Sequence, residues 1–583
     1  MANCPNCNAP LEDDARFCAN CGASITPEAQ PAAPAAEAPA AETIFCPNCG
    51  EQTSAAYEYC EHCGAALNAG GGQKEKKTGG SGMKKWLICG GIVVIAAALI
   101  IVLISIFSGG GGKGYGLYIK DGEMYYSRLS KNGVWQVTSK LKDDVDNSYF
   151  MYYGEYISRA TVMSKDGKTL FFPDKLDNNS SGVTLYYRST ASEKQEAKKV
   201  DSDITRYAVN DSASLVTYLK NGNLYQFDVK RGEKSDKMAG DVSTFYVSED
   251  GKKIVYLEDD EGEYLLNVID SGKDKVKLAS GVSLQYVSDD CKTIVYMKDD
   301  TLYLNQGAKD KDTKIASDVY GTVRVYDTGE VYYVTEDDNE LTLCYFDGKK
   351  TSTELIEEFD YWNDYTVSSH DSAAMLVYQD NDDEYQLVVG GGKPKALKAE
   401  EPSSFTFSKD GKSIWYVDEP DKNYEGDLYK VTISNGAIKS TDEVDGEVYA
   451  SYVVYTPGGH LVYFKDVKNS EGELWVDGKK ADDDVALSSL QESESGALLY
   501  FVDYNFNKGY GTLKQYSGGK AAQIADDVYS FAVLPNGSVL YLLDYSTSRY
   551  RGDLYVCSGS RSTQLDEDVV TIIPVTSNKY GYY

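Results

Sequence analysis

Histidine is nearly absent from this 583-residue chain, which contains three. Beyond residue 113 only His370 and His460 occur, and that part of the chain has no GxSxG elbow, HExxH helix, Walker loop or dinucleotide fingerprint in a strand–helix context. Ser369, His370 and Asp371 have the letters of a catalytic triad, but neighbours on one hairpin cannot face one another in triad geometry. We therefore predict that both histidines lie in turns and that the chain is not an enzyme.

Basic residues are also scarce relative to acidic ones. The chain has 58 Lys and Arg against 90 Asp and Glu, a net charge of −32, and residues 114–583 account for −29 of it. Such a surface repels phosphate backbones, so we predict no nucleic-acid partner. Acidic runs recur at residues 259–263, 337–340, 380–384 and 482–484. Oxygen-rich loops can hold Ca²⁺, but none follows an EF-hand register, and solvated turns are the favoured interpretation.

Cysteine is rare outside the first 63 residues, which contain eight of the twelve. These eight form two copies of C-x2-C-x10-C-x2-C. Each CxxC on a tight turn points two thiolates at one ion, and the second pair completes a tetrahedron. We predict two structural Zn²⁺ ions, one held by each copy, with the ligands Cys4, Cys7, Cys18, Cys21, Cys46, Cys49, Cys60 and Cys63. The three later cysteines at or near strands, Cys291, Cys344 and Cys557, are predicted to be buried small hydrophobic residues.

Two other uses of these cysteines are less favoured. Disulfides suit an exported domain, whereas the orientation argued below places this segment in a reducing compartment. A thioredoxin-like CxxC needs a surrounding α/β fold, which about 25 residues cannot supply. The segment resembles the double zinc ribbon proteins of bacteria, in which paired ribbons precede a transmembrane helix. That resemblance implies zinc binding and protein contacts. Residues 1–67 hold nine acids and one arginine, a composition poorly suited to nucleic acid.

A long apolar run follows. The 22 residues Trp86–Phe107 carry no charge and span about 33 Å as a helix, enough to cross a hydrocarbon core of about 30 Å. A cleaved signal peptide would begin near residue 1. Five lysines lie at residues 74–85 and only Lys113 follows closely. The positive-inside rule therefore predicts a single-pass cell-membrane protein with a cytoplasmic N-terminus and an extracytoplasmic C-terminal domain.

These observations give seven segments. They are zinc ribbon 1 (1–24), an Ala/Pro-rich linker (25–43), zinc ribbon 2 (44–67), a Gly/Lys-rich linker (68–85), the transmembrane helix (86–107), a Gly-rich tether (108–114) and a β-propeller region (115–583).

A repeated motif predicts the propeller. Ser-x-Asp-Gly-Lys-x-Ile-x-Tyr is seen at Ser248–Tyr256 and Ser408–Tyr416, with Leu and Phe replacing Ile and Tyr at Ser164–Phe172 and Cys replacing Gly at Ser288–Tyr296. Looser copies end at Tyr218, Tyr333, Tyr378, Tyr463, Tyr500 and Tyr541. Asp-Gly between apolar strands predicts a tight turn. Four short strands every ~40 residues are typical of propeller blades, and the motif resembles the TolB-like, WD40-related repeats of bacterial propellers.

The two ends of this region predict a closed ring. Tyr115–Leu141 supplies three strands without a leading strand, and Val569–Val575 looks like a leading strand without a blade. Pairing them gives about eleven four-stranded units. Single rings usually hold four to eight blades, which slightly favours two rings over one large ring.

The expected function is that of a membrane-anchored binding or sensory protein. The extracytoplasmic propeller would bind a ligand or protein, and the cytosolic ribbons would make protein contacts, so that partners lie on both sides of the membrane. No motif identifies the extracellular ligand. A cell-envelope scaffold is the alternative, and a propeller-based hydrolase or lyase is less favoured because the residue pairings that it needs are missing.

Overall fold

The computed structural model describes Thr43–Phe45, Gln52–Ser54, residues 114–574 and Tyr580–Tyr582, apart from residues 140, 143–144, 175, 177–181, 362–364, 370–373 and 381. The chain divides into two compact units, Met1–Met83 and Lys84–Tyr583. In the first unit, β1 (Thr43–Phe45) pairs antiparallel with β2 (Gln52–Ser54), with Ile44 opposite Thr53. β1 begins at Thr43, the last residue of the predicted linker.

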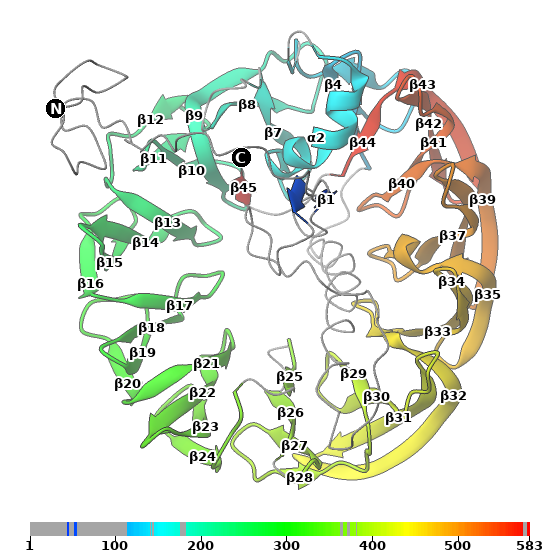
Figure 1. Ribbon diagram of the computed structural model, residues 1–583. Helices are drawn as coiled ribbons and strands as arrows, with labels where there is room; N and C mark the ends of the chain where they lie inside the picture. Colours follow the sequence, from blue (N-terminus) through cyan, green and yellow to red (C-terminus); the bar gives the residue numbers. More distant parts are fainter. Residues whose placement is uncertain are drawn as a thin grey trace, which may run out of the picture. The chain divides into compact units, whose positions relative to one another are not determined.

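The described part of the second unit consists of antiparallel sheets that repeat along the chain (Figure 1). Six sheets have four strands each, one eight-stranded sheet contains two groups of four, and one eleven-stranded sheet contains three. We call each group of four a blade. Blade 1 consists of β44 (Thr571–Ile573), β3 (Gly116–Lys120), β4 (Glu123–Ser127) and β5 (Val134–Gln136).

Blades 2 and 3 share the long strand β9, which is the last strand of blade 2 and the first of blade 3. Their strands are β6 (Val162–Met163), β7 (Thr169–Asp174), β8 (Val183–Ser189), β9 (Lys198–Val209), β10 (Leu215–Lys220), β11 (Asn223–Asp228) and β12 (Glu233–Lys234). Blade 4 has β13 (Val242–Val247), β14 (Lys253–Asp260), β15 (Glu263–Asp270) and β16 (Val276–Ser280).

The next three blades are separate four-stranded sheets. Blade 5 has β17 (Ser283–Val287), β18 (Ile294–Lys298), β19 (Thr301–Asn305) and β20 (Asp312–Ala316). Blade 6 has β21 (Val319–Val325), β22 (Glu330–Asp337), β23 (Glu340–Asp347) and β24 (Ser352–Ile356). Blade 7 has β25 (Tyr365–Val367), β26 (Met375–Gln379), β27 (Tyr385–Val389) and β28 (Lys395–Ala396).

Blades 8 and 9 share β32, and a single bridge from β35 joins blade 9 to blade 10. Blades 8 and 9 contain β29 (Ser403–Phe407), β30 (Ser413–Asp418), β31 (Glu425–Ser434), β32 (Ala437–Tyr455), β33 (Leu461–Lys468), β34 (Glu471–Val476) and β35 (Lys479–Ala486). The 3₁₀ turn η1 (Leu487–Ser489) precedes blade 10. Blades 10 and 11 contain β36 (Gln491–Glu492), β37 (Leu498–Asn505), β38 (Tyr510–Ser517), β39 (Lys520–Val528), β40 (Ser530–Val533), β41 (Val539–Ser546), β42 (Arg551–Ser558) and β43 (Arg561–Val569).

The predicted terminal closure is confirmed. β44 pairs antiparallel with β3, with Ile573 opposite Leu117 and Thr571 opposite Ile119. The slight preference for two rings is wrong, because the blades follow one another around a single ring (Figure 1). One apolar cluster joins each blade to the next. The cluster that contains Ile572 packs blade 11 against blade 1, so the series of clusters returns to its start.

The repeated turn is held by similar hydrogen bonds in blades 2, 4, 5 and 8. In blade 2, Ser164 Oγ accepts hydrogen bonds from the backbone N–H of Lys168 and Thr169 and donates to Asp166 at 2.8 Å. Glycine follows Asp with a positive φ, as at Gly251 (φ 76°), because it has no Cβ to clash there. In blade 5 Cys291 occupies this position at φ 56°, and its side chain is fully buried.

The tyrosine that ends the motif is buried and locks neighbouring blades together in several places. In blade 3, Tyr218 stacks on Tyr225 and donates a 2.9 Å hydrogen bond to Asp201, which lies in the blade 2 part of β9. Lys220 and Lys234 also donate to Asp201. The corresponding Tyr–Asp contacts join blades 11 and 1, 8 and 9, and 9 and 10 through Tyr118–Asp566, Tyr463–Asp445 and Tyr500–Asp482.

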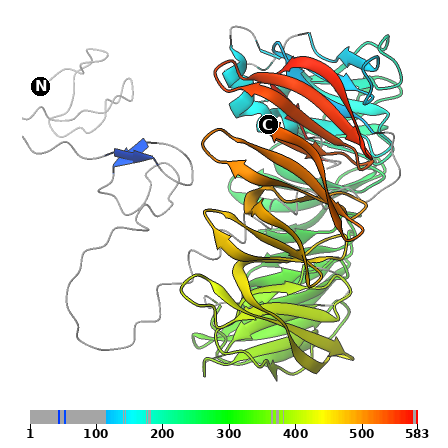
Figure 2. The same ribbon diagram turned by 90° about the vertical axis from the view of Figure 1, so that its right-hand side faces the viewer.

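Antiparallel strands place successive turns alternately on two sides of the ring. The Ser-x-Asp-Gly-Lys turns lie on one side, the motif face. The turns between second and third strands lie on the other, the hairpin face, together with the connections between blades. The connection from blade 1 to blade 2 contains the helix α2 (Asn147–Arg159), which the repeat did not predict. Figure 2 shows α2 (cyan) at one edge of the ring, on the hairpin face.

α2 begins where the Asp146 carboxylate accepts a hydrogen bond from the Ser148 N–H at 2.9 Å. Its inner side packs Phe150 and Ile157 into the cluster shared by blades 1 and 2. Gly154 allows close approach, since a Cβ there would lie 3.4 Å from Thr571 Cγ2 on β44. The last strand, β45 (Tyr580–Tyr582), pairs with β9. The helix therefore lies beside the closure, whereas the tail lies on the first strand of blade 3.

Candidate functional site

The eight predicted zinc ligands lie outside the described residues. β1 and β2 do, however, bracket one of the four CxxC pairs. Phe45 lies opposite Gln52, and the six residues that connect them include Cys46 and Cys49. Two cysteines in a short connection between paired strands are what the knuckle of a zinc ribbon requires.

The predicted membrane segment, Trp86–Phe107, also lies outside the described residues. Within the part of the chain that the structure describes, α2 and every other helix are too short or too polar to cross a membrane.

The candidate catalytic residues of the ring are in structural positions where they are described. The His460 N–H donates to Thr456 Oγ1 at 3.1 Å inside a turn, as predicted, and its Nδ1 lies 2.7 Å from Asp477. His370 and Asp371 lie outside the described residues. The prediction for the later cysteines is confirmed, because Cys291, Cys344 and Cys557 are buried and none forms a disulfide.

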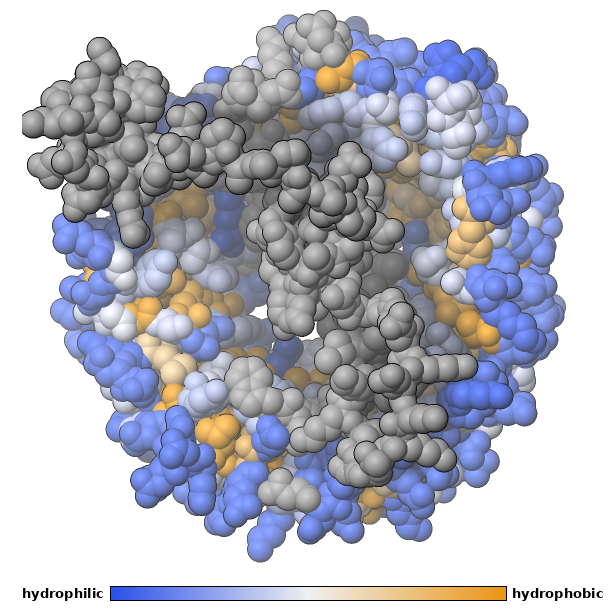
Figure 3. Space-filling model, in the orientation of Figure 1, coloured by the Kyte–Doolittle hydropathy of each residue, from blue (hydrophilic) through white to orange (hydrophobic). Residues whose placement is uncertain are grey.

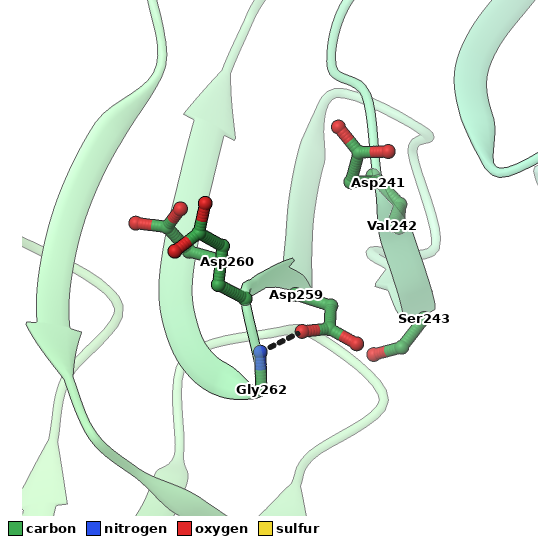
Figure 4. A pocket seen from close by; sticks show the side chains of 7 residues that line it. Asp241, Val242, Ser243, Asp259, Asp260 and Gly262 are labelled. Atoms are coloured by element: carbon green, nitrogen blue, oxygen red, sulfur yellow. Dashed lines mark hydrogen bonds between the residues drawn. The ribbon is translucent and has the colours of Figure 1, made fainter.

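Carboxylates crowd the hairpin face. A pocket of about 620 Å³ on blade 4 is lined by Asp241, Asp259, Asp260 and Glu261 (Figure 4). The Asp259 carboxylate accepts a hydrogen bond from the Gly262 N–H at 2.8 Å, while Asp260 points away from it. In the described residues no group of three or more His, Cys, Asp or Glu side chains is arranged to hold a metal ion. The acids of the blade 4 pocket form a negative surface.

The crowding perturbs carboxylates elsewhere on this face. On blade 11 burial raises the pKa of Asp553, and the neighbouring Glu567, Asp544 and Asp568 raise it further. On blade 8 the charge of Glu400 is the main cause that raises the pKa of Glu419. Like charges held this close repel one another, which favours any ligand that brings positive charge.

Exposed aromatic side chains also gather on the hairpin face. Among the described residues, the large hydrophobic side chains left exposed are Val444 and seven aromatics: Tyr152, Tyr153, Tyr156, Tyr264, Tyr320, Tyr424 and Phe506. Each aromatic lies in α2, in a turn between second and third strands, or beside a connection between blades. Figure 3 views this side, where the rim of the ring is mostly hydrophilic and paler residues lie near α2.

The largest group of exposed aromatics is centred on α2. Tyr152 is 71% exposed, Tyr156 53% and Tyr153 47%. Tyr153 stacks on Tyr149, with ring centroids 4.6 Å apart. The sequence motif could not reveal these side chains, because they lie in an insertion that interrupts the repeat. A cluster of tyrosines that follows Asp146 and belongs to no copy of the repeat was the sequence feature that could have indicated them.

The comparisons with known proteins identify the N-terminal segment. Residues 4–64 match the model of the double zinc ribbon family. The chain carries a double zinc ribbon domain. This domain implies zinc binding, and its match covers all eight predicted ligands. The family match does not extend to the ring. No curated protein matches the chain.

Solved structures similar to the chain share little sequence with it. A eukaryotic initiation factor has 10% identity and a TM-score of 0.37, covering 70% of this chain and 98% of that one. The tricorn protease has 11% identity and a TM-score of 0.25, covering 79% and 62%. Porphyromonas gingivalis dipeptidyl peptidase 4 has 11% identity and a TM-score of 0.33, covering 63% and 59%. With all three TM-scores below 0.5, we infer no activity from these proteins.

Proposed function

We propose that the chain is a membrane-anchored, non-enzymatic binding protein. In this proposal Trp86–Phe107 crosses the cell membrane once, the zinc ribbons contact proteins in the cytoplasm, and the ring binds a partner outside. The observation that carries the proposal is the gathering of exposed aromatic side chains on one face of the ring. Apolar side chains that are exposed next to one another, as the three tyrosines of α2 are, are typical of interaction sites.

The point where the chain enters the ring supports this arrangement. Gly114 lies against Leu129 and Asn536, both in turns of the motif face. A membrane helix that ends at Phe107 would be joined to Gly114 by residues 108–113, which reach at most about 25 Å. The motif face would then be held near the membrane, and the hairpin face would point away from it toward a partner.

The topology can be tested on intact cells. Single cysteines are introduced in each region, for example Asn221→Cys at an exposed position of the β10–β11 turn and Ser24→Cys at the end of the first ribbon. A membrane-impermeant maleimide should label Asn221→Cys, once any outer barrier is removed, and should label Ser24→Cys only after lysis. The reverse pattern would refute the orientation.

The ribbons are proposed to hold two structural zinc ions through the eight cysteines named above. Zinc binding at such sites is worth roughly 10–16 kcal/mol, whereas so few residues bury almost no core. Metal analysis of the full chain should give two zinc ions, and Cys4→Ser should remove one. A metal-free parent chain would refute the proposal. The loss of both ions from Cys4→Ser would refute independent ribbons.

A further inference from the structure

One continuous group of aromatic side chains runs from α2 onto blades 10 and 11. Asn147 Nδ2 donates to Arg549 O at 3.2 Å, so α2 rests on the β41–β42 turn. Tyr152 lies close enough to Tyr550 in that turn to raise the pKa of Tyr550. Behind this contact Tyr545 stacks on Tyr529 at 3.8 Å. We call the outermost members of this group the aromatic band: Tyr152, Tyr153, Tyr156, Tyr550, Tyr504 and Phe506.

The blade 10 end of the band approaches the connection to blade 11 around Gly509. A Cβ added at Gly509 would lie 3.3 Å from Tyr529 and 3.9 Å from the hydroxyl of Tyr504. Tyr504 in turn contacts Phe506 edge to face at 5.0 Å, and Phe506 is 49% exposed. The band thus extends over three separate elements. The motif tyrosines are buried between blades, where packing explains them. Core packing does not explain the exposure of Tyr152, Tyr153, Tyr156 and Phe506. Tyr504 and Tyr550 are half-buried beside them.

Negative charge borders the band. Asp146 caps the helix beside Tyr550, and Asp544, Asp553, Glu567 and Asp568 crowd together on blade 11. Arg551 contacts Asp568 at 3.1 Å and offsets part of this charge. Arg549 and Lys508 lie in the turns that carry Tyr550 and Phe506, so the acids predominate on blade 11 rather than over the whole band. A partner that reaches blade 11 gains from bringing positive charge.

Elsewhere in the ring, cationic side chains already lie over aromatic faces. Lys234 Nζ lies 3.8 Å from the ring centroid of Tyr225, and the guanidinium of Arg206 lies 5.1 Å from that of Tyr580. Arginine and lysine combine a charge with an apolar stem that covers aromatic surface, and Tyr and Arg are enriched where protein partners bind most strongly.

We propose that the aromatic band is a docking site for a lysine- and arginine-rich segment of a protein partner. The tyrosine faces receive the cationic side chains, and the surrounding carboxylates supply long-range attraction. This inference deepens the proposed function, on which it rests only in requiring the ring to be a binding module.

Binding of a fluorescent peptide of about 16 residues, rich in Lys and Arg, to the full chain in detergent tests the site. The expected result is saturable binding that weakens as salt is raised. The triple variant Tyr152→Ala/Tyr153→Ala/Tyr156→Ala should lose at least about tenfold in affinity. The matched control Tyr264→Ala, an exposed tyrosine on the same face but on blade 4, should change affinity less than about twofold. Replacing the three helix tyrosines by Phe should restore most of the binding, since the faces remain.

Four results would overturn the site. These are unchanged affinity in the triple alanine variant, equal binding of a glutamate-rich peptide, displacement by a neutral N-acetylglucosamine oligomer, and a concentration-dependent dimer of the parent chain that the triple variant lacks. The last two would assign the band to a glycan or to a second copy. The maleimide labelling is independent of all four, so failure of the band and failure of the proposed function are distinguishable. Equal melting temperatures of the parent and triple variant confirm that the variant is folded.

Discussion

Ending the chain after Asp568 tests how the ring closes. This truncation removes β44 and with it the strand that pairs with β3. It also removes four side chains that are at most 7% exposed, namely Val569, Val570, Ile572 and Ile573. The truncated chain leaves one edge of β3 unpaired, where blade 1 meets blade 11.

The magnitude follows from the burial. Burying a Val or Ile side chain stabilises by about 1.5–3 kcal/mol, so four of them contribute about 6–12 kcal/mol. This is an upper estimate, since the unfolded chain already buries part of that surface. Even half of it, about 3–6 kcal/mol, is a large fraction of the stability of a typical domain, about 5–15 kcal/mol. We therefore expect the ring to open rather than to weaken slightly.

A second truncation, after Ser577, provides the control. It keeps β44 and removes β45, whose Tyr580 hydroxyl accepts a hydrogen bond from the Val247 N–H at 3.1 Å. Thermal melting followed by circular dichroism, with size-exclusion chromatography, compares the two chains. The chain ending at Asp568 should lose its cooperative transition and aggregate through the new edge, whereas the chain ending at Ser577 should melt only slightly below the parent. Melting of the shorter chain within about 2 °C of the parent would refute closure by β44.

Three further predictions concern the ring. Burial raises the pKa of Tyr333 and of Tyr378 to about 12. A raised pKa contributes stability below the unfolded value of about 10 and loses it as pH rises toward 12, so each tyrosine should cost about 1.4 kcal/mol per pH unit in that range. Alkaline melting that is unchanged in the Tyr333→Phe variant would contradict this. Gly222→Ala should destabilise by about 1 kcal/mol through its positive φ alone. Gly251→Ala should destabilise by about 2–3 kcal/mol, because its Cβ would also lie 2.9 Å from Asn210 Cβ. Equal urea midpoints of the two variants would show that the Asn210 contact adds no cost. Asp201→Asn should destabilise by about 2–3 kcal/mol, since it removes the charge that two lysines share. Lys234 and Lys220 outweigh burial and hold the pKa of Asp201 well below its usual range. The difference in free energy of unfolding between variant and parent should therefore shrink below about pH 4.

The blades were predictable because each repeats one local solution. The Ser-x-Asp-Gly-Lys turn satisfies its own backbone, as Ser248 Oγ does for Lys253 N–H at 2.9 Å. The tyrosine that ends the motif then enters the core in the same register each time. Local hydrogen bonding and strand periodicity both depend on short stretches of sequence. The strands and the closure by Val569–Val575 could therefore be predicted.

The number of rings and the inserted helix could not be predicted in the same way. Whether blades form one ring or two depends on small angles between neighbouring sheets, which no single motif encodes. The helix gave a weak signal, since Phe150, Gly154, Ile157 and Ser158 are the residues that it buries and only two of them are large and apolar. The zinc ligands, by contrast, gave a strong signal. Their spacing alone predicted the ligand set, and the family match covers the same residues.

Tyrosine has two different places in this molecule, and composition cannot separate them. Tyr218 and Tyr463 recur with the repeat, are fully buried, and donate to aspartates of the preceding blade. Tyr152 and Tyr156 fall outside the repeat and are more than half exposed. The demands of blade packing explain any residue that keeps the repeat's period. A residue that breaks the period and still leaves aromatic surface in water is not explained by folding, because exposing it gains nothing for the ring. Departure from the period is thus what distinguishes the candidate binding residues from the many tyrosines that build the fold.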